Sequence, residues 1–205
     1  DMTRQVWAFR GLRERETVLN AGPKHALLSG VLGRNLSQHG MNSADVFKFR
    51  KDFGDLEFAT IGEKQAETLV RVSDEFSAHA EAMNSALNNF ISFSPSLSIA
   101  EQFVGVTNAE THSKGTLVAV RMDSYRLVPN MTSDFNREHE FLAPLVVFPD
   151  EVMLLQSNYG ASDADRKAFI KKLKALGCPK ETLEDEVNWD HQVDRVMDFY
   201  SRIER

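Results

Sequence analysis

The chain begins with a short apolar segment and continues with apolar residues at helical spacing. Residues 5–12 combine aromatic and aliphatic side chains and are bounded by charged residues, a pattern typical of a β-strand. From residue 23 to residue 38 apolar residues recur at helical spacing, the stretch opens with a proline, and Gly40 follows it. This stretch predicts a short helix.

Two further helical segments precede the next strand. Asn42 or Ser43 is placed to cap a short helix that ends near Gly54. The clearest periodicity follows in residues 69–87, where apolar side chains spaced three or four apart share one helix face. We expect this long helix to lead directly into a strand that begins at Phe90.

The second half of the chain changes character and is rich in strand patterns. Ser96 or Ser98 is placed to cap a short helix that includes Phe103, and Gly115 marks the turn into the next strand. Apolar or alternating segments predict five strands, at residues 90–93, 116–122, 126–128, 141–148 and 152–155.

The helical pattern returns after the last of these strands. Ser162 is a candidate N-cap for a helix over residues 163–176, and Gly177 follows as a typical C-terminal glycine. A final amphipathic stripe runs through residues 183–203. These patterns predict that the chain ends in helices.

Domain organisation follows from the order of these elements. The chain has no internal repeat, low-complexity tract or linker, so we expect a single α+β domain over residues 1–205. In that domain, residues 13–89 form a mainly helical insertion after the first strand, and residues 161–205 form the C-terminal helices.

The composition is that of an ordinary globular domain, and the net charge disfavours one class of partner. The chain has 205 residues, of which 42% are hydrophobic and 26% charged. Its formal charge of -6 argues against a nucleic-acid backbone as the main partner. No apolar stretch approaches the roughly 20 residues that span a bilayer. The lone Cys178 cannot form an intramolecular disulfide, and we expect a buried or half-buried thiol.

Candidate chemistry lies in three short segments next to predicted strands. Arg10 stands near the end of the first strand, where its planar guanidinium suits phosphate oxygens, and Gly11 lets the backbone approach a ligand closely. Glu140 supplies a carboxylate that can balance a positive charge on a ribose in a transition state. Ser92 can donate a hydrogen bond and orient that carboxylate. Together, these groups suit an enzyme that binds NAD and breaks its glycosidic bond.

The three segments, taken in order, resemble a known family. They read Val-Trp-Ala-Phe-Arg-Gly-Leu from Val6, Phe-Ile-Ser-Phe-Ser from Phe90, and Glu-His-Glu from Glu138. This combination resembles the arginine-serine-glutamate class of mono-ADP-ribosyltransferases, which includes many bacterial toxins and secreted effectors. The resemblance covers roughly residues 6–155. It implies a split antiparallel β-sandwich around an NAD cleft.

The resemblance also implies a role for each residue on the NAD side. Arg10 corresponds to the arginine that binds the NAD phosphates and the nicotinamide ribose, and the Gly11 backbone to the group that holds the nicotinamide amide. Ser92 matches the first serine of the family's Ser-Thr-Ser, with Phe93 in place of the threonine. Ser94, the second serine, is then also expected at the NAD site.

On the catalytic side, the resemblance makes Glu140 the catalytic glutamate and Glu138 the residue that activates or positions the acceptor. Phe93 and Phe103 are candidates to stack near the nicotinamide, with core packing as the default explanation for both. The family's substrate-recognition loop corresponds to residues 130–137, in which Phe135 is the one aromatic that could contact a protein target.

The activity implied is transfer of ADP-ribose from NAD to a side chain of a target host protein. Family members with Glu-x-Glu very often modify arginine, so arginine is the favoured acceptor. Threonine, asparagine or a protein such as ubiquitin are the other known kinds of acceptor. We expect a monomer, secreted by a bacterium and acting in the cytosol of a target cell. The six histidines show no zinc-like pairing, so no metal is expected.

Several alternatives remain open on the sequence alone. Each residue has an ordinary structural explanation: a surface arginine beside a turn, a strand serine, and two solvated glutamates at a strand start. An NAD glycohydrolase would use the same groups with water as the acceptor. A non-catalytic interaction module on the same fold would use none of them. A two-carboxylate glycosidase fits less well, because carboxylates two residues apart on one strand do not readily flank a sugar bond.

Overall fold

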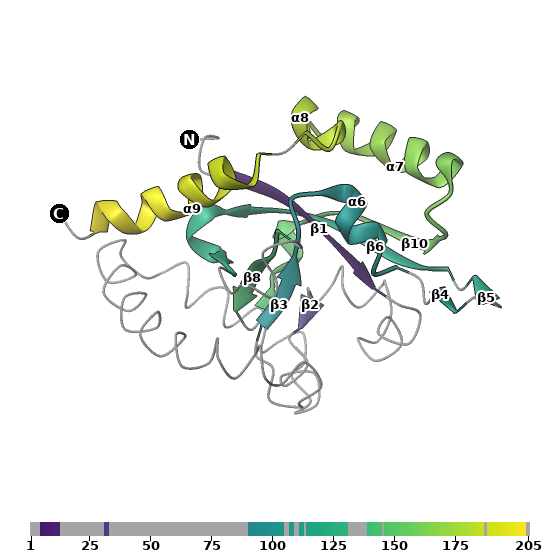
Figure 1. The fold of residues 1–205 in the computed structure, drawn as a ribbon, viewed down its shortest axis with the longest axis horizontal. Helices are drawn as coiled ribbons and strands as arrows, with labels where there is room; N and C mark the ends of the chain where they lie inside the picture. Colours follow the sequence, from purple (N-terminus) through teal and green to yellow (C-terminus); the bar gives the residue numbers. More distant parts are fainter. Residues whose placement is uncertain are drawn as a thin grey trace.

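The computed structural model shows an α+β protein built from small antiparallel sheets and flanking helices (Figure 1). It describes residues 5–12, 31–32, 90–104, 107–108, 111–112, 114–130, 139–144, 146–186 and 188–203. The helices predicted for residues 42–54 and 69–87 lie outside these ranges.

One sheet has the strand order β1-β6-β10. Strand β1 (Gln5–Leu12) pairs along its whole length with β6 (Gly115–Asp123), and β10 (Val152–Tyr159) covers the other edge of β6. Because side chains alternate along a strand, Val6, Ala8 and Arg10 share one face of this sheet, and Trp7 and Phe9 share the other. Arg10 and the large aromatics therefore point to opposite sides.

A second sheet has the order β3-β8-β7. Strand β3 (Phe90–Phe93) pairs with β8 (Phe141–Pro144), which pairs in turn with β7 (Val128–Pro129). Two-stranded ladders join β2 (Val31–Leu32) to β9 (Val146–Val147), and β4 (Thr107–Asn108) to β5 (Thr111–His112).

The two larger sheets are joined by the backbone of one residue pair. The amide of Phe9 donates to the carbonyl of Ser94 (2.7 Å), and the amide of Ser94 donates to the carbonyl of Phe9 (2.9 Å). The buried apolar side chains between the sheets form one core, with members from β1, β6, β3 and β8 and from the last helix. Burying these side chains is the main source of stability on this side of β1.

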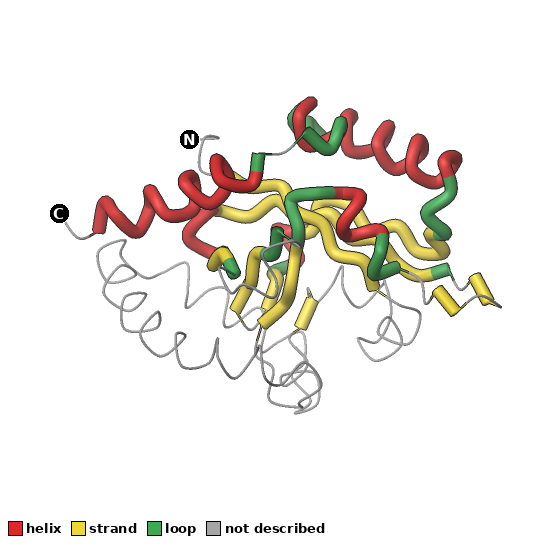
Figure 2. Tube along the Cα trace, in the orientation of Figure 1, coloured by secondary structure: helices red, strands yellow, loops and turns green. Residues whose placement is uncertain are grey.

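Helices cover the opposite face of the first sheet (Figure 2). They are α6 (Leu97–Glu101), α7 (Asp163–Ala175) and α8 (Lys180–Leu183), and α9 (Trp189–Ile203) ends the described chain. A second core forms where Phe169 and Leu173 of α7 meet Trp7 and Phe9 of β1. Strand β1 is thus buried on both faces.

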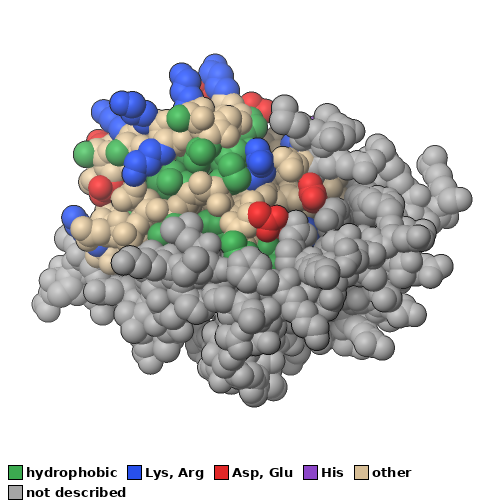
Figure 3. Space-filling model, turned by 180° about the vertical axis from the view of Figure 1, so that it is seen from behind, with side chains coloured by type: hydrophobic (Ala, Val, Ile, Leu, Met, Phe, Trp, Pro, Cys, Tyr) green, Lys and Arg blue, Asp and Glu red, His purple; other side chains and the backbone are tan. Residues whose placement is uncertain are grey.

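Helix α7 shows how the sequence specifies a surface helix. Ser162 caps its N-terminus by accepting a hydrogen bond from the amide of Asp165, whose carboxylate is bonded in return by the Ser162 amide and hydroxyl. Lys167, Lys171 and Lys174 are exposed on its outer side, and blue side chains gather along this edge in Figure 3. The apolar side faces the sheet, as the amphipathic pattern predicts.

Much of the expected secondary structure is confirmed. The strands predicted at 5–12 and 90–93 match β1 and β3 residue for residue, and the predicted cap Ser96 begins α6. Gly115 opens β6, and the helix predicted for 163–176 matches α7 to within one residue. The α+β class is likewise confirmed.

The helix predicted over residues 23–38 is contradicted at its centre. Val31 and Leu32 form strand β2, hydrogen-bonded to Val146 and Val147 of β9. A β-branched residue such as Val31 favours an extended backbone where a strand edge is available for pairing. The partner strand is distant in the sequence, so the spacing of apolar residues does not reveal this pairing. The rest of that predicted helix lies outside the described residues.

Other differences concern where strands and helices begin and end. The strand predicted at 126–128 starts as a 3₁₀ turn, η2 (Ser124–Arg126), closed by the Leu127 amide on the Ser124 carbonyl, and only Val128 is in a strand. The strand predicted at 141–148 divides into β8 and β9, and β10 continues four residues beyond the expected end at residue 155. The final stripe divides into α8 and α9.

Candidate active site

Arg10 connects the first and second motif segments directly. Its Nη1 donates a hydrogen bond to the carbonyl oxygen of Ser92 at 3.0 Å, across 82 positions of sequence. Arg10 is half-buried on the side of β1 that faces the second sheet. The guanidinium is thereby held against β3 at its serine motif, as a ligand-binding arginine needs to be held.

Ser94 occupies the junction between the two sheets. Its backbone makes both hydrogen bonds to Phe9, and its Oγ accepts from the amide of Ser96 at 3.2 Å, just before α6. The hydroxyl of Ser94 therefore shapes the turn that leads into this helix. The structure brings Arg10, Ser92 and Ser94 together around this junction.

Glu140 lies immediately before strand β8, and only 6% of it is exposed. Ser92 pairs with Leu142, and Phe93 with Phe141, which is the last pair of this ladder and follows Glu140 directly. On the other side of β8, the amide of Asn130 donates to the carbonyl of Glu140 at 2.9 Å. Glu140 is thus hydrogen-bonded through its backbone to Asn130, where β7 and β8 adjoin.

The side chain of Asn130 is the hydrogen-bond donor to the Glu140 carboxylate. Nδ2 of Asn130 lies 2.6 Å from Oε2 of Glu140, and Asn130 is only 1% exposed. Sequence reasoning gave the orienting role to Ser92 and placed Asn130 at the start of a recognition loop. A polar residue after a strand is usually a turn residue, so local pattern gives no signal that this one is buried beside a carboxylate.

The backbone before Glu140 is held in an unusual conformation. His139 has φ 46°, in the left-handed region that residues other than glycine seldom adopt. Its ring stacks on Trp189, the first residue of α9, with centroids 5.3 Å apart and planes 6° apart. Phe141 contacts the same indole ring at 4.8 Å. Trp189 therefore contacts the residues on both sides of Glu140 and fixes the backbone around it.

Gly11 is required by packing against α6. A Cβ atom there would lie 2.2 Å from the carbonyl oxygen of Ala100 and 2.9 Å from the carbonyl carbon of Phe103. The close approach that the sequence assigned to a ligand is therefore made, in part, by the backbone of this helix. Phe103, predicted near the nicotinamide, is 39% exposed just beyond α6.

Glu138 lies outside the described residues, as does the predicted recognition loop from residue 131 to residue 137. Of the predicted site, the described structure therefore brings Arg10 to Ser92, and it places Glu140 directly before the strand that pairs with the serine strand.

The other buried carboxylate among the described residues, Glu151, is paired with an arginine. Glu151 in the turn η4 (Pro149–Glu151) accepts hydrogen bonds from Arg126 at 2.8 and 3.0 Å, and the guanidinium lies 4.7 Å from the ring centroid of Phe148. The Phe148 amide donates to the same carboxylate at 2.8 Å. This fork geometry is that of a structural ion pair.

A second arginine ties the C-terminal helices to α6. Arg166 of α7 lies 3.4 Å from Glu101 and 3.6 Å from Asp185. Asp185 in turn accepts from the Ser96 hydroxyl at 2.8 Å and the Leu97 amide at 2.9 Å. Burial, together with the hydrogen bond to Glu101, raises the pKa of Tyr159 well above its ordinary value. This network joins α6 to the C-terminal helices.

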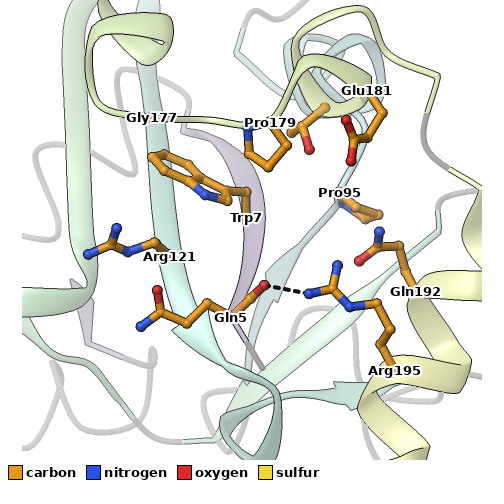
Figure 4. A pocket seen from close by; sticks show the side chains of 10 residues that line it. Gln5, Trp7, Pro95, Arg121, Gly177, Pro179, Glu181, Gln192 and Arg195 are labelled. Atoms are coloured by element: carbon orange, nitrogen blue, oxygen red, sulfur yellow. Dashed lines mark hydrogen bonds between the residues drawn. The ribbon is translucent and has the colours of Figure 1, made fainter. Parts of the chain in front are cut away.

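A small pocket opens on the helical side of β1, away from Arg10 (Figure 4). Its volume is about 170 Å³, below the roughly 300–1,000 Å³ of typical ligand pockets. Arg121 and Arg195 lie on either side of Trp7, and Arg195 donates to the Gln5 carbonyl at 3.1 Å. Because Gln5 and Trp7 alternate with Arg10 along β1, this pocket is on the wrong face to include the predicted site.

The described residues include one free thiol and no cluster of side chains suited to a metal ion. No group of three or more His, Cys, Asp or Glu side chains there could hold a metal ion. Cys178 is buried, and burial with the nearby charge of Glu181 raises the pKa of its thiol to about 12. Among the described helices, none is long and apolar enough to cross a membrane.

Comparisons with known proteins leave the interpretation to the residues themselves. No protein-family model, no curated protein and no solved structure matches this chain.

Proposed function

We propose that this protein is an NAD-dependent mono-ADP-ribosyltransferase. The observation that carries the proposal is the hydrogen bond from Arg10 to the Ser92 carbonyl beside the point where the two sheets meet, with Glu140 directly before the strand that pairs with β3. The arginine and the serine that it contacts are 82 positions apart in the sequence, and the buried glutamate, 48 positions later, directly precedes the strand that pairs with the serine strand. Convergence of this kind supports the motif resemblance more than any single residue does.

The chemistry follows from the groups available. The bond between C1′ of the ribose and the nicotinamide nitrogen breaks, and the electron pair stays with nicotinamide, which leaves as a neutral molecule. Positive charge then develops on the ribose, and the Glu140 carboxylate stabilises it. Arg10 offers its guanidinium to the pyrophosphate oxygens. An acceptor nitrogen or oxygen attacks C1′, and Glu138 takes the proton that the acceptor loses.

The proposed acceptor is a side chain of a host protein, with arginine favoured and threonine the second choice. The proposed setting is that of a bacterial effector or toxin acting in a target cell's cytosol. Both rest on the resemblance of the three motif segments. NAD serves as substrate, and no metal takes part in the proposed reaction.

The test is incubation with labelled NAD and a eukaryotic cell lysate, with free nicotinamide and labelled protein bands both measured. Wild type, Glu140→Gln and Glu138→Ala are compared, and Glu184→Gln is the matched control because Glu184 is exposed in a surface ion pair with Lys180. The proposal expects a discrete labelled band that Glu140→Gln and Glu138→Ala lose and that Glu184→Gln keeps.

The same assay separates the alternatives. Nicotinamide release without any labelled band, unaffected by Glu138→Ala, would identify an NAD glycohydrolase. Absence of NAD consumption by wild type at any enzyme concentration would contradict the enzymatic proposal and leave an interaction module.

A further inference from the structure

The donor to the Glu140 carboxylate is a neutral amide on the adjacent strand. Asn130 Nδ2 lies 2.6 Å from Glu140 Oε2, and the two residues are 1% and 6% exposed. Among the described residues, no other side chain hydrogen-bonds to this carboxylate. A buried carboxylate needs such a donor, because desolvation of an unbonded charge is costly.

Backbone pairing fixes this contact. Val128 and Pro129 pair with Leu142 and Phe141, and the next step of the register is the bond from the Asn130 amide to the Glu140 carbonyl at 2.9 Å. Directly opposed residues in an antiparallel pair have their Cβ atoms about 4.5–5.5 Å apart on the same face. The two side chains are therefore neighbours because of the strand register.

The charge of the donor matters for the chemistry proposed. An arginine partner, such as Arg126 beside Glu151, neutralises a carboxylate and would compete with a cationic transition state. An amide fixes the orientation of the carboxylate and leaves its negative charge in place. Asn130 thus provides orientation without neutralisation.

We propose that Asn130 is the positioning residue for Glu140, holding Oε2 so that the carboxylate is oriented toward the developing charge on the ribose. This inference rests on the proposed function and moves the orienting role from Ser92 to the neighbouring strand. It concerns kcat rather than NAD affinity, because Asn130 contacts the carboxylate that the proposal assigns to the transition state and is given no contact to NAD.

The test replaces the donor without changing the shape of the side chain. Asn130→Asp removes the N–H donor and sets a second carboxylate against Glu140. Asn158→Asp is the matched control, since the same chemical change falls on an exposed residue of β10. Initial rates of nicotinamide release give kcat and KM for NAD between pH 5 and pH 8, and thermal unfolding checks the fold of each variant.

We expect Asn130→Asp to lower kcat about 10- to 100-fold at pH 8, with KM for NAD within about twofold of wild type. The loss should shrink toward pH 5, because two adjacent carboxyls share one proton and that proton restores a donated hydrogen bond. Arg10, which contacts β3, and His139, which precedes Glu140, are present in every variant and therefore do not distinguish the profiles. Asn158→Asp should match wild type.

Asn130→Ser is a second variant that buries no added charge, and it serves as the test if Asn130→Asp fails to fold. It should lower kcat and leave KM for NAD unchanged. Unchanged kcat in a folded Asn130 variant, or a loss confined to KM, would overturn the inference while leaving the proposed function intact. Absence of nicotinamide release by wild type would overturn both.

Discussion

Glu140 and Glu151 are almost equally buried, at 6% and 7% exposure, yet their surroundings differ in charge. Glu151 is gripped by the fork of Arg126 at 2.8 and 3.0 Å, whereas Glu140 accepts a hydrogen bond from the neutral amide of Asn130 at 2.6 Å. Burying a carboxylate is unfavourable unless it is paired and hydrogen-bonded. The arginine neutralises the charge of Glu151, whereas a neutral amide does not neutralise a carboxylate, which is what the reaction proposed for Glu140 requires.

The same contrast extends to the helical side of β1. Glu101 and Asp185 both lie near Arg166, and Asp185 also accepts hydrogen bonds at the start of α6. These carboxylates fasten α6 to the C-terminal helices. Variants of each kind of carboxylate therefore test whether the described acids divide into structural and reactive groups.

The largest expected effect on stability is at the buried ion pair. Glu151→Ala leaves the Arg126 guanidinium buried without its carboxylate and should lower the free energy of unfolding by about 3–5 kcal/mol. Urea denaturation measures this change. The double variant Arg126→Met with Glu151→Leu should recover most of the loss, and a single-variant loss below about 1 kcal/mol would show that Glu151 is not structural.

A smaller effect, on NAD turnover, is expected at Arg10. A lysine has one ammonium in place of the fork and cannot both hold the Ser92 carbonyl and bind phosphate oxygens in bidentate fashion. Arg10→Lys should lower kcat/KM for NAD about 100-fold, which is roughly 2.7 kcal/mol at 1.36 kcal/mol per factor of ten. Steady-state nicotinamide release is the measurement, and a value within threefold of wild type would remove Arg10 from the site.

Asp185 should show an intermediate structural effect. Its carboxylate accepts from the Ser96 hydroxyl and from the amides of Leu97 and Ser98 at 2.8, 2.9 and 3.3 Å. Asp185→Ala should lower the free energy of unfolding by about 1–3 kcal/mol, because the start of α6 loses these bonds. Chemical denaturation again gives the value, and an unchanged midpoint with unchanged slope would contradict the fastening role.

The smallest effect is expected at the exposed cap of α7. Ser162→Ala should cost about 1 kcal/mol of stability. The hydrogen bond from Ser162 lowers the pKa of Asp165 in the folded state. The stability that this hydrogen bond contributes is therefore present above the unfolded pKa of Asp165, about 3.9, and is lost as the pH falls through its lower folded pKa. Thermal unfolding at pH 7 and pH 2.5 should show a wild-type advantage that narrows in acid.

Local patterns predict the elements whose stability is local. Strand β1 is an unbroken apolar segment bounded by charge, and α7 has its cap at Ser162 and a glycine at residue 177, so both could be located from the sequence. Strand β2 could not be located from the sequence, because its two residues form a strand only by pairing with β9, more than 100 positions away. The turn at Arg126 likewise depends on Glu151, 25 positions away.

The candidate site divides along the same line. The residue types near Arg10, Ser92 and Glu140 could be identified as suited to NAD chemistry from sequence alone. Which side chain donates to Glu140 depends on the register between two strands and on the burial of Asn130, and neither is encoded in spacing. The sequence therefore predicts which residue is the candidate reactive group, and the pairing of strands determines which side chain lies beside it.

The most direct test of the division between the two buried glutamates is a side-by-side comparison of Glu140→Gln with the Arg126→Met and Glu151→Leu double variant. Each is measured for the initial rate of nicotinamide release from NAD and for thermal unfolding. We predict that Glu140→Gln loses about a thousandfold in rate, roughly 4 kcal/mol, while its melting temperature stays close to wild type. The double variant should keep the rate. Wild-type turnover by Glu140→Gln would contradict the central claim.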